Sequence, residues 1–217
     1  MKNNLFSVLV LIFFFSLAAV EFDTTKDLPR LYNEHKSSTV SLMAGQAKDI
    51  NGLPSFEFFS ATGFVIDAEK GYIFTAGHFA RDERVLFFNK IVMKQIKIDT
   101  DIECAIFQVD PLLLKNHKEV KLSIDVTIGD TIFVIGDPHQ KKKVLTSGLL
   151  SKKNVLVPPL FNMGVLLTDA LIVAGSSGSP VFNLKGEVIG CAVGHYDGFG
   201  LILPAQTIIN FINSLND

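Results

Sequence analysis

The feature of this sequence that most constrains its fold is a series of short apolar runs separated by turn residues. The runs are rich in Val, Ile, Leu and Phe, and Gly, Asp, Asn, Pro and Lys stand between them. Such spacing, with almost no helical pattern between the runs, is the signature of an all-β barrel or sandwich. We expect strands at residues 39–43, 56–59, 63–66, 72–75, 85–88, 91–98, 104–109, 131–135, 143–150, 164–168, 181–182, 187–193 and 200–203.

These runs are numerous enough for two small barrels, the first at about residues 38–112 and the second at about 120–203, with residues 111–121 as the crossover. A polar loop is expected at residues 45–54. The 19 Phe residues, in a chain without Trp, must fill much of the core. We expect a short surface helix or arm within residues 24–36 and a terminal amphipathic helix at residues 204–215.

The N-terminus reads as a targeting segment. A single lysine precedes an apolar run at residues 5–17, and Ser16 and Ala18 are the small residues that a signal peptidase reads. We expect a signal peptide at residues 1–18, followed by the folded domain at residues 22–217. The run is short for a membrane span, which needs about 20 residues, although an uncleaved anchor stays open. In either case the domain is expected outside the cytoplasm, secreted or periplasmic.

Charge and cysteine usage exclude some classes of function. A formal net charge of -2 gives no reason to expect nucleic acid or anionic lipid as a partner. The histidines and the two cysteines, Cys104 and Cys191, form no cluster with metal-ligand spacing, so no metal or cofactor is predicted. Two buried free thiols are the default expectation for the cysteines, although a disulfide stays possible in an oxidising compartment.

One stretch carries a candidate nucleophile. Within residues 166–181 an apolar run breaks into Gly175-Ser176-Ser177-Gly178-Ser179-Pro180, where small residues allow a tight turn with its N–H groups facing outward. A serine nucleophile needs such donors beside it and a base to take its proton. His78, directly after the run at residues 72–75, is the candidate base.

Several segments together resemble trypsin-fold serine proteases, and most closely the HtrA/DegP-type protease domain. Gly-Ser-Pro-Val-Phe-Asn is also similar to secreted glutamyl endopeptidases. The matching segments follow one another in order across most of the chain, at residues 63–66, 71–78, 147–151, 168–170, 175–182 and 186–190. The resemblance implies two six-stranded antiparallel β-barrels with the active site in the cleft between them.

The resemblance also implies roles for individual residues. Ser177 matches the nucleophile, His78 the general base, and the backbone N–H groups of Gly175 and Ser177 the oxyanion hole. The acid is where this sequence departs from the pattern, because Glu103 stands in its position, directly before the run Cys104-Ala105-Ile106-Phe107. Glutamate is longer than the usual aspartate and requires the backbone to lie farther back. Asp101, two residues earlier, is the alternative acid.

By the same resemblance, Leu171 is expected at the base of the substrate pocket and Ala192 and Val193 in its wall. None of them offers a charge to a charged substrate residue. The histidine of glutamyl endopeptidases aligns with Ala192 and not with His195. We therefore expect a serine endopeptidase that cleaves polypeptides after small or medium apolar residues.

The alternative function is a protease-fold binding or chaperone-like protein with little turnover, for which the unusual Glu103 is the only support. HtrA-type proteins commonly carry peptide-binding PDZ domains and assemble as trimers. Because Asp217 ends the chain directly after the expected helix, no PDZ-dependent regulation is expected, whereas a homo-oligomer stays possible.

Overall fold

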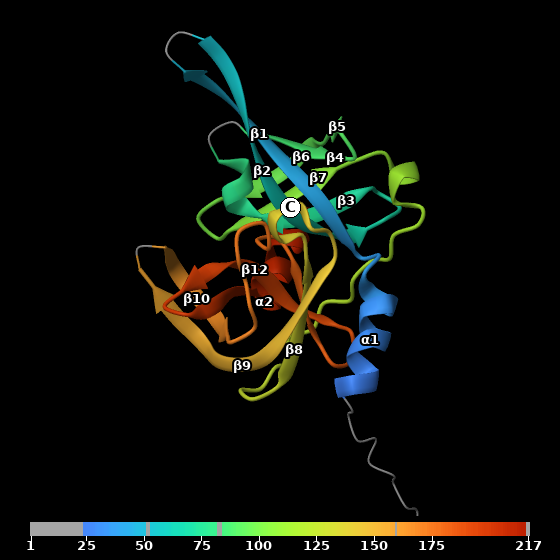
Figure 1. The fold of residues 1–217 in the computed structure, drawn as a ribbon, viewed down its shortest axis with the longest axis vertical. Helices are drawn as coiled ribbons and strands as arrows, with labels where there is room; N and C mark the ends of the chain where they lie inside the picture. The colour runs from blue at the N-terminus through green and yellow to red at the C-terminus, as the bar shows by residue number, and fades with distance from the viewer. Residues whose placement is uncertain (1–23, 51–52, 82–83, 159, 216–217) are drawn as a thin grey trace, which may run out of the picture.

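The computed structural model describes residues 24–50, 53–81, 84–158 and 160–215. The strands of this region form two sheets, one above the other in the view of Figure 1. The all-β class with a short C-terminal helix is therefore confirmed.

The first sheet lies in the N-terminal half, and its strand order is β5-β4-β1-β2-β3-β7-β6. Every neighbouring pair in it is antiparallel. It has seven strands, one more than a six-stranded barrel, because the tight turn at Asn89 and Lys90, both with positive φ, adds the two-residue strand β5 beside β4. The strands are β1 (Thr39–Ile50), β2 (Leu53–Asp67), β3 (Tyr72–Ala76), β4 (Val85–Phe88), β5 (Ile91–Val92), β6 (Lys94–Asp99) and β7 (Cys104–Gln108).

The second sheet closes into a six-stranded barrel in the order β10-β13-β12-β11-β8-β9. Its strand count agrees with the prediction. The strands are β8 (Thr131–Gly136), β9 (Val144–Val157), β10 (Phe161–Thr168), β11 (Pro180–Asn183), β12 (Val188–Tyr196) and β13 (Phe199–Pro204).

Phenylalanine fills the centre of both halves, as the composition predicted. Phe64 and Phe74 are fully buried with ring centroids 5.1 Å apart, and Phe133 and Phe182 are fully buried and stacked at 4.9 Å. A large ring contributes much buried apolar area per residue, which suits the narrow interior of a small barrel.

In the described part of the chain, helices lie near its two ends and in three short turns. α1 (Thr24–His35) lies beside the second barrel in Figure 1, where the His35 ring is 5.2 Å from that of Phe182. α2 (Ala205–Asn213) packs against β12 and β13, and the following Ser214 accepts a hydrogen bond of 2.6 Å from Lys97 of β6 through its carbonyl oxygen. The C-terminal segment therefore joins the two halves. The short 3₁₀ helices are η1 (Gly77–Ala80), η2 (Pro111–Leu114) and η3 (Pro138–Gln140).

The polar loop expected at residues 45–54 is wrong. β1 and β2 pair along their whole length, from Thr39 opposite Phe64 to Ile50 opposite Leu53, so the segments expected at residues 56–59 and 63–66 belong to one long strand. Backbone hydrogen bonds hold a two-stranded ribbon together even where its side chains are polar, so the apolar pattern did not reveal it. The hairpin projects from the body of the molecule in Figure 1.

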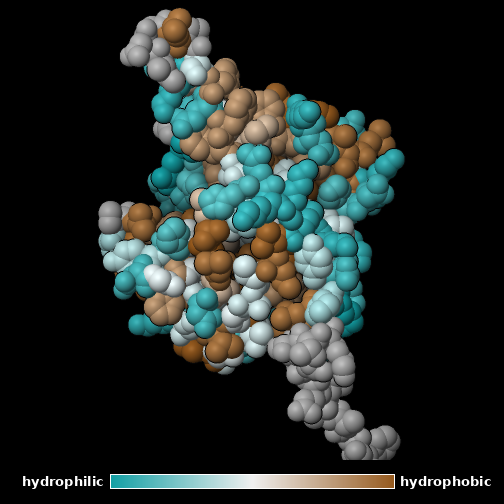
Figure 2. All heavy atoms as spheres, viewed as in Figure 1, coloured by the Kyte–Doolittle hydropathy of each residue, from teal (hydrophilic) through white to brown (hydrophobic). Residues whose placement is uncertain are grey.

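Hydrophobic side chains lie open to solvent on this hairpin. Phe56 and Phe58 are about half exposed, and their rings stack with centroids 6.0 Å apart. Figure 2 shows hydrophobic surface below the grey tip of the hairpin. Among the described residues, no helix is both long and apolar enough to cross a membrane.

Candidate active site

His78 lies at the junction of a strand and a 3₁₀ turn. β3 ends at Ala76, and η1 carries His78 in its first turn, at the edge of a cleft. The preceding Gly77 allows the turn to approach β7, because a Cβ there would lie 2.9 Å from the amide nitrogen of Cys104. The imidazole side chain stays partly accessible, with 26% of it exposed.

Glu103 is buried directly beside His78, with 3% of the residue exposed. Its Oε2 accepts a hydrogen bond of 2.7 Å from Nδ1 of His78 and one of 3.1 Å from the backbone N–H of the same residue. A carboxylate oxygen only accepts, so the Nδ1 atom carries the proton and Nε2 is left as the basic nitrogen.

The backbone before β7 accommodates the longer acid side chain. Asp99 ends β6, and its carboxylate accepts hydrogen bonds from the N–H groups of Asp101 and Ile102 at 3.0 and 3.2 Å. Glu103 then has a φ of +57°, a conformation that few residues other than glycine adopt. The turn brings Glu103 to His78 and leaves Asp101 exposed to solvent.

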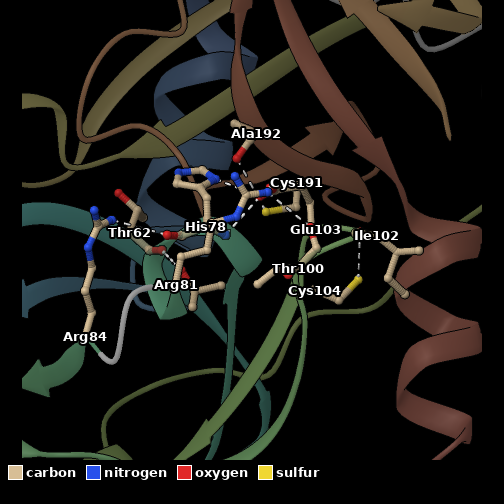
Figure 3. A network of polar contacts seen from close by, with 11 residues as sticks. Thr62, His78, Arg81, Arg84, Thr100, Ile102, Glu103, Cys104, Cys191 and Ala192 are labelled. Carbon is tan, nitrogen blue, oxygen red and sulfur yellow. Dashed lines mark hydrogen bonds and ion pairs between the residues drawn. The ribbon is translucent and has the colours of Figure 1, made fainter. Parts of the chain in front are cut away.

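Arg81 completes the surroundings of the buried carboxylate. Its guanidinium donates a hydrogen bond of 2.8 Å to Oε1 of Glu103 and one of 3.2 Å to the carbonyl oxygen of Thr100. Figure 3 shows His78, Arg81 and Glu103 together with these contacts.

The loop between β10 and β11 presents Ser177. Gly175 and Gly178 on either side have φ values of +90° and +88°. Both lie close to other backbone, since a Cβ on Gly178 would be 1.8 Å from the carbonyl oxygen of Thr62. Of the three serines in the loop, Ser176 and Ser179 are buried, whereas Ser177 is partly exposed and lines the cleft.

The peptide bond before Gly175 is held by a neighbouring loop. The carbonyl oxygen of Ala174 accepts a hydrogen bond of 3.3 Å from the N–H of His139. In a trans peptide the N–H points away from the C=O, so the N–H of Gly175 points away from His139. Within the described part of the chain, the N–H groups of Gly175 and Ser177 have no backbone acceptor, which leaves them able to bind an incoming oxygen.

Two cavities meet at Ser177. The first is a cleft of about 630 Å³ between the two halves, in which His78 and Ser177 lie with Gly175, Phe58 and Arg84 on its walls. The second, of about 300 Å³, extends from Ser177 into the second barrel. Its lining is mainly apolar and consists of Leu160, Phe161, Val173, Ala174, Ser177, Val193, Gly194, His195 and Leu201.

The residues predicted for the substrate pocket are only partly brought together here. Val193 lines the second cavity. Leu171 does not line it and is 62% exposed, because its segment turns outward, where its carbonyl oxygen accepts a hydrogen bond of 3.0 Å from the Thr146 hydroxyl. Ala192 is fully buried, and its backbone bonds Gly178 and Ser179 of the loop that carries Ser177. Among the three, Val193 alone lines the pocket.

The two cysteines are both free and buried, in agreement with the default expectation. Burial is the main cause that raises the pKa of both thiols, and the negative charge of Glu103 adds to it. Among the described residues, no group of three or more His, Cys, Asp or Glu side chains is arranged to hold a metal ion.

Sequence reasoning missed Arg81 and Thr62. Arg81 follows His78 by three residues, the repeat of a 3₁₀ helix, and only a prediction of η1 could have placed the two side chains on one face. Thr62 is a polar residue within an apolar strand, and nothing in the sequence indicates that its hydroxyl bonds the carbonyl oxygen of Gly175 and the N–H of Asp137, far away in the chain.

Comparison with known proteins found sequences and structures similar to this chain. A family model described as trypsin-like peptidase domain matches residues 61–191. A probable periplasmic serine endoprotease, DegP-like, of Pseudomonas putida is 28% identical over 210 residues, covering 80% of this chain and 43% of the relative. The protein with the same description in Halomonas elongata is 30% identical over 171 residues, covering 72% of this chain and 35% of the relative.

Solved structures of an HtrA-type protease, AlgW, have a similar fold. The structure with a decapeptide has a TM-score of 0.71 at 18% identity, covering 86% of this chain and 66% of AlgW. The structure with a tripeptide has a TM-score of 0.72 at 19% identity, covering 86% and 62%. The chain spans less than half the length of the DegP-like relatives described above.

Proposed function

Because the chain belongs to the family of trypsin-like peptidase domains, we propose that it is a serine endopeptidase with Ser177 as nucleophile, His78 as general base and Glu103 as the acid that orients the histidine. The observation that carries this proposal is the 2.7 Å hydrogen bond between His78 Nδ1 and buried Glu103, at the edge of the cleft that Ser177 also lines.

The reaction follows from the protonation state of the pair. With the Nδ1 proton directed at Glu103, Nε2 of His78 takes the proton of the Ser177 hydroxyl as Oγ attacks the carbonyl carbon of the scissile bond. The imidazolium then gives this proton to the leaving amine, and the acyl-enzyme remains on Ser177. Water attacks the ester in a second round with the same base, which releases the acid product and restores the serine.

The N–H groups of Gly175 and Ser177 are proposed as the oxyanion hole. Their lack of a backbone acceptor among the described residues, and the hydrogen bond that holds the Ala174 carbonyl to His139, support this role. Donors fixed before the reaction stabilise the negative charge of the tetrahedral intermediate without having to reorganise.

We propose cleavage after small or medium apolar residues. The cavity beside Ser177 supports this preference, because Val193, Phe161 and Leu201 on its walls are apolar and its volume of about 300 Å³ is limited. Among the described residues that line it, His195 is the only one with an ionisable side chain. A buried substrate charge would lose its hydration there without gaining a strong partner.

The site of action proposed is the periplasm or the cell exterior, on polypeptide substrates. The DegP-like relatives of this chain are described as periplasmic, which supports it. The signal segment proposed for residues 1–18 lies outside the described residues. A homo-oligomer is compatible with the proposal but is not required by it, because His78, Glu103 and Ser177 come from one chain.

The competing function, binding with little turnover, would rest on the glutamate at position 103. Glu103 does not favour a binding function without turnover, because its carboxylate lies within hydrogen-bonding distance of Nδ1 of His78.

The experiment that tests the proposal is labelling with a fluorophosphonate probe, which reacts with serines activated by a base. We expect the wild-type protein to be labelled, and Ser177→Ala to abolish labelling while Ser176→Ala, at the buried neighbour, keeps it. Labelling that survives Ser177→Ala, or a folded wild type that takes up no probe, would contradict the proposed function.

A further inference from the structure

We propose that Arg81 is a positioning residue, which fixes the carboxylate of Glu103 so that it can orient His78. The inference deepens the proposed function and rests on it. Figure 3 shows the arrangement, in which His78 and Arg81 hold the two oxygens of the same carboxylate.

The two oxygens of the Glu103 carboxylate accept hydrogen bonds from different residues. Oε2 of Glu103 accepts both hydrogen bonds from His78, at 2.7 and 3.1 Å. Oε1 accepts one bond of 2.8 Å, from Arg81, and no other donor to it is recorded among the described residues. Glu103 is 3% exposed, so with Arg81 in place its carboxylate has little contact with water. Without Arg81, Oε1 of this buried carboxylate would lose its hydrogen-bond donor.

The local backbone explains why Arg81 can reach the carboxylate of Glu103. A 3₁₀ helix has three residues per turn, so side chains three positions apart lie above one another on the same face. His78 lies in η1 and Arg81 follows its last residue, with the Arg81 N–H bonded to the carbonyl oxygen of His78 at 3.5 Å. The turn that presents the histidine therefore also presents the arginine to the same carboxylate.

The need for such a residue follows from the length of glutamate. Compared with aspartate, its carboxylate lies at the end of one more rotatable bond and can turn away from the imidazole. The second bond of Arg81, of 3.2 Å to the Thr100 carbonyl oxygen, ties the guanidinium to the turn that precedes Glu103. Arg81 thus links the end of η1 to the β6–β7 turn and holds one oxygen of the carboxylate between them.

The experiment compares four proteins by the kinetics of fluorophosphonate labelling, which separates the maximal rate kinact from the binding constant KI. We expect Arg81→Met to lower kinact about tenfold, the size of effect for losing a hydrogen bond to a charged group, with KI changed less than about twofold. Arg81→Lys, which keeps a charged donor, should recover most of the rate. The matched control is Arg30→Met, at a surface arginine of α1 that pairs with Asp27 and Glu34. It should leave both constants unchanged.

A second comparison tests whether Arg81 acts through Glu103. In the Glu103→Gln background, the additional substitution Arg81→Met should lower kinact less than about twofold, because the carboxylate that Arg81 holds is absent. A tenfold loss in both backgrounds would overturn the inference, since it would place the effect of Arg81 elsewhere.

The outcomes also separate this inference from the proposed function. A wild type that is not labelled would contradict both the proposed function and the inference about Arg81. If the wild type is labelled and Arg81→Met is labelled at the same rate, only the inference about Arg81 is contradicted. If Arg81→Met does not fold, as judged by its thermal unfolding, Arg81→Lys and Arg81→Gln decide. The inference requires the lysine variant to be the faster of the two, and equal rates would overturn it.

Discussion

The hydroxyl of Thr62 donates a hydrogen bond of 2.7 Å to the carbonyl oxygen of Gly175, 113 residues later in the chain. The same hydroxyl accepts a bond of 3.0 Å from the N–H of Asp137, and the N–H of Thr62 donates one of 3.0 Å to the carbonyl oxygen of Ser177. One buried residue of β2 therefore holds two separate loops of the second barrel.

Replacing this hydroxyl should destabilise the protein and slow its reaction. Thr62→Val keeps the side-chain shape but leaves the Gly175 carbonyl and the Asp137 N–H without their partner, which we expect to cost about 2 kcal/mol or more in the free energy of unfolding. Thr62→Ser keeps the hydroxyl and should cost about 1 kcal/mol. Urea unfolding measures both, and equal losses for the two variants would show that the hydroxyl contributes little.

Gly178 should tolerate no side chain. Its φ is +88°, and a Cβ would lie 1.8 Å from the carbonyl oxygen of Thr62, so Gly178→Ala adds a clash with backbone to the strain of a positive φ. We expect a loss of more than about 3 kcal/mol. Gly198 is the matched control, with a φ of +83° and open space around its Cβ position. Gly198→Ala should lose about 1 kcal/mol. Similar unfolding midpoints for the two variants would be inconsistent with the clash.

The two candidate acids should differ sharply. Glu103→Gln removes the charge that orients His78 and stabilises its protonated form, and we expect the labelling rate to fall by a factor on the order of 10² to 10⁴. Asp101→Asn changes an exposed side chain and should leave the rate within about twofold. The reverse ranking would assign the acid to Asp101.

Substrate preference should change with Val193 and not with Leu171. Val193→Phe adds a ring to the wall of the cavity beside Ser177, so a peptide library should show the preferred residue shifting from medium apolar side chains to Ala or Gly. Leu171→Ala lies outside this cavity and should leave the profile unchanged. A wild-type profile dominated by Arg, Lys or Glu would contradict the proposed specificity.

Because of Lys143, the free energy of unfolding should depend on pH in the alkaline range. Its Nζ donates hydrogen bonds to the carbonyl oxygens of Lys36, at 2.7 Å, and Thr39. Burial lowers its pKa to about 8, partly offset by the charge of Asp137. The ordinary pKa of lysine is about 10.4, so between about pH 8 and that value the unfolded chain binds more protons than the folded one.

The free energy of unfolding should therefore rise with pH across this window. We expect a contribution on the order of 1 kcal/mol, after allowing for screening by solvent. Lys143→Met lacks the titrating group, so the difference between wild type and variant should change by this amount in urea unfolding measured across the window. A constant difference would show that the ammonium group is not penalised in the folded state.

The strands were predictable wherever apolar residues and turn residues alternate in short runs, as at residues 85–88, where β4 has the expected bounds. The long β1–β2 hairpin was not, because its outer half is held by backbone pairing and not by apolar side chains. His78 and Ser177 stood in local motifs that sequence reasoning can read. The position of Glu103 beside His78 depends on a positive φ that the sequence does not show, and the position of Arg81 depends on a 3₁₀ turn that no sequence pattern indicates.

The bonds from Thr62 to the loop that carries Ser177 have a consequence for biosynthesis. Translation proceeds from the N-terminus, so the first half of the chain, with His78 and Glu103, is complete before the ribosome has made Ser177. The loop that carries Ser177 is then held in place by Thr62 N–H and Oγ1 only when the second barrel docks on the first. A second barrel that has not docked therefore lacks the bonds from Thr62 to this loop, and His78, Glu103 and Ser177 come together only when both halves are folded against each other.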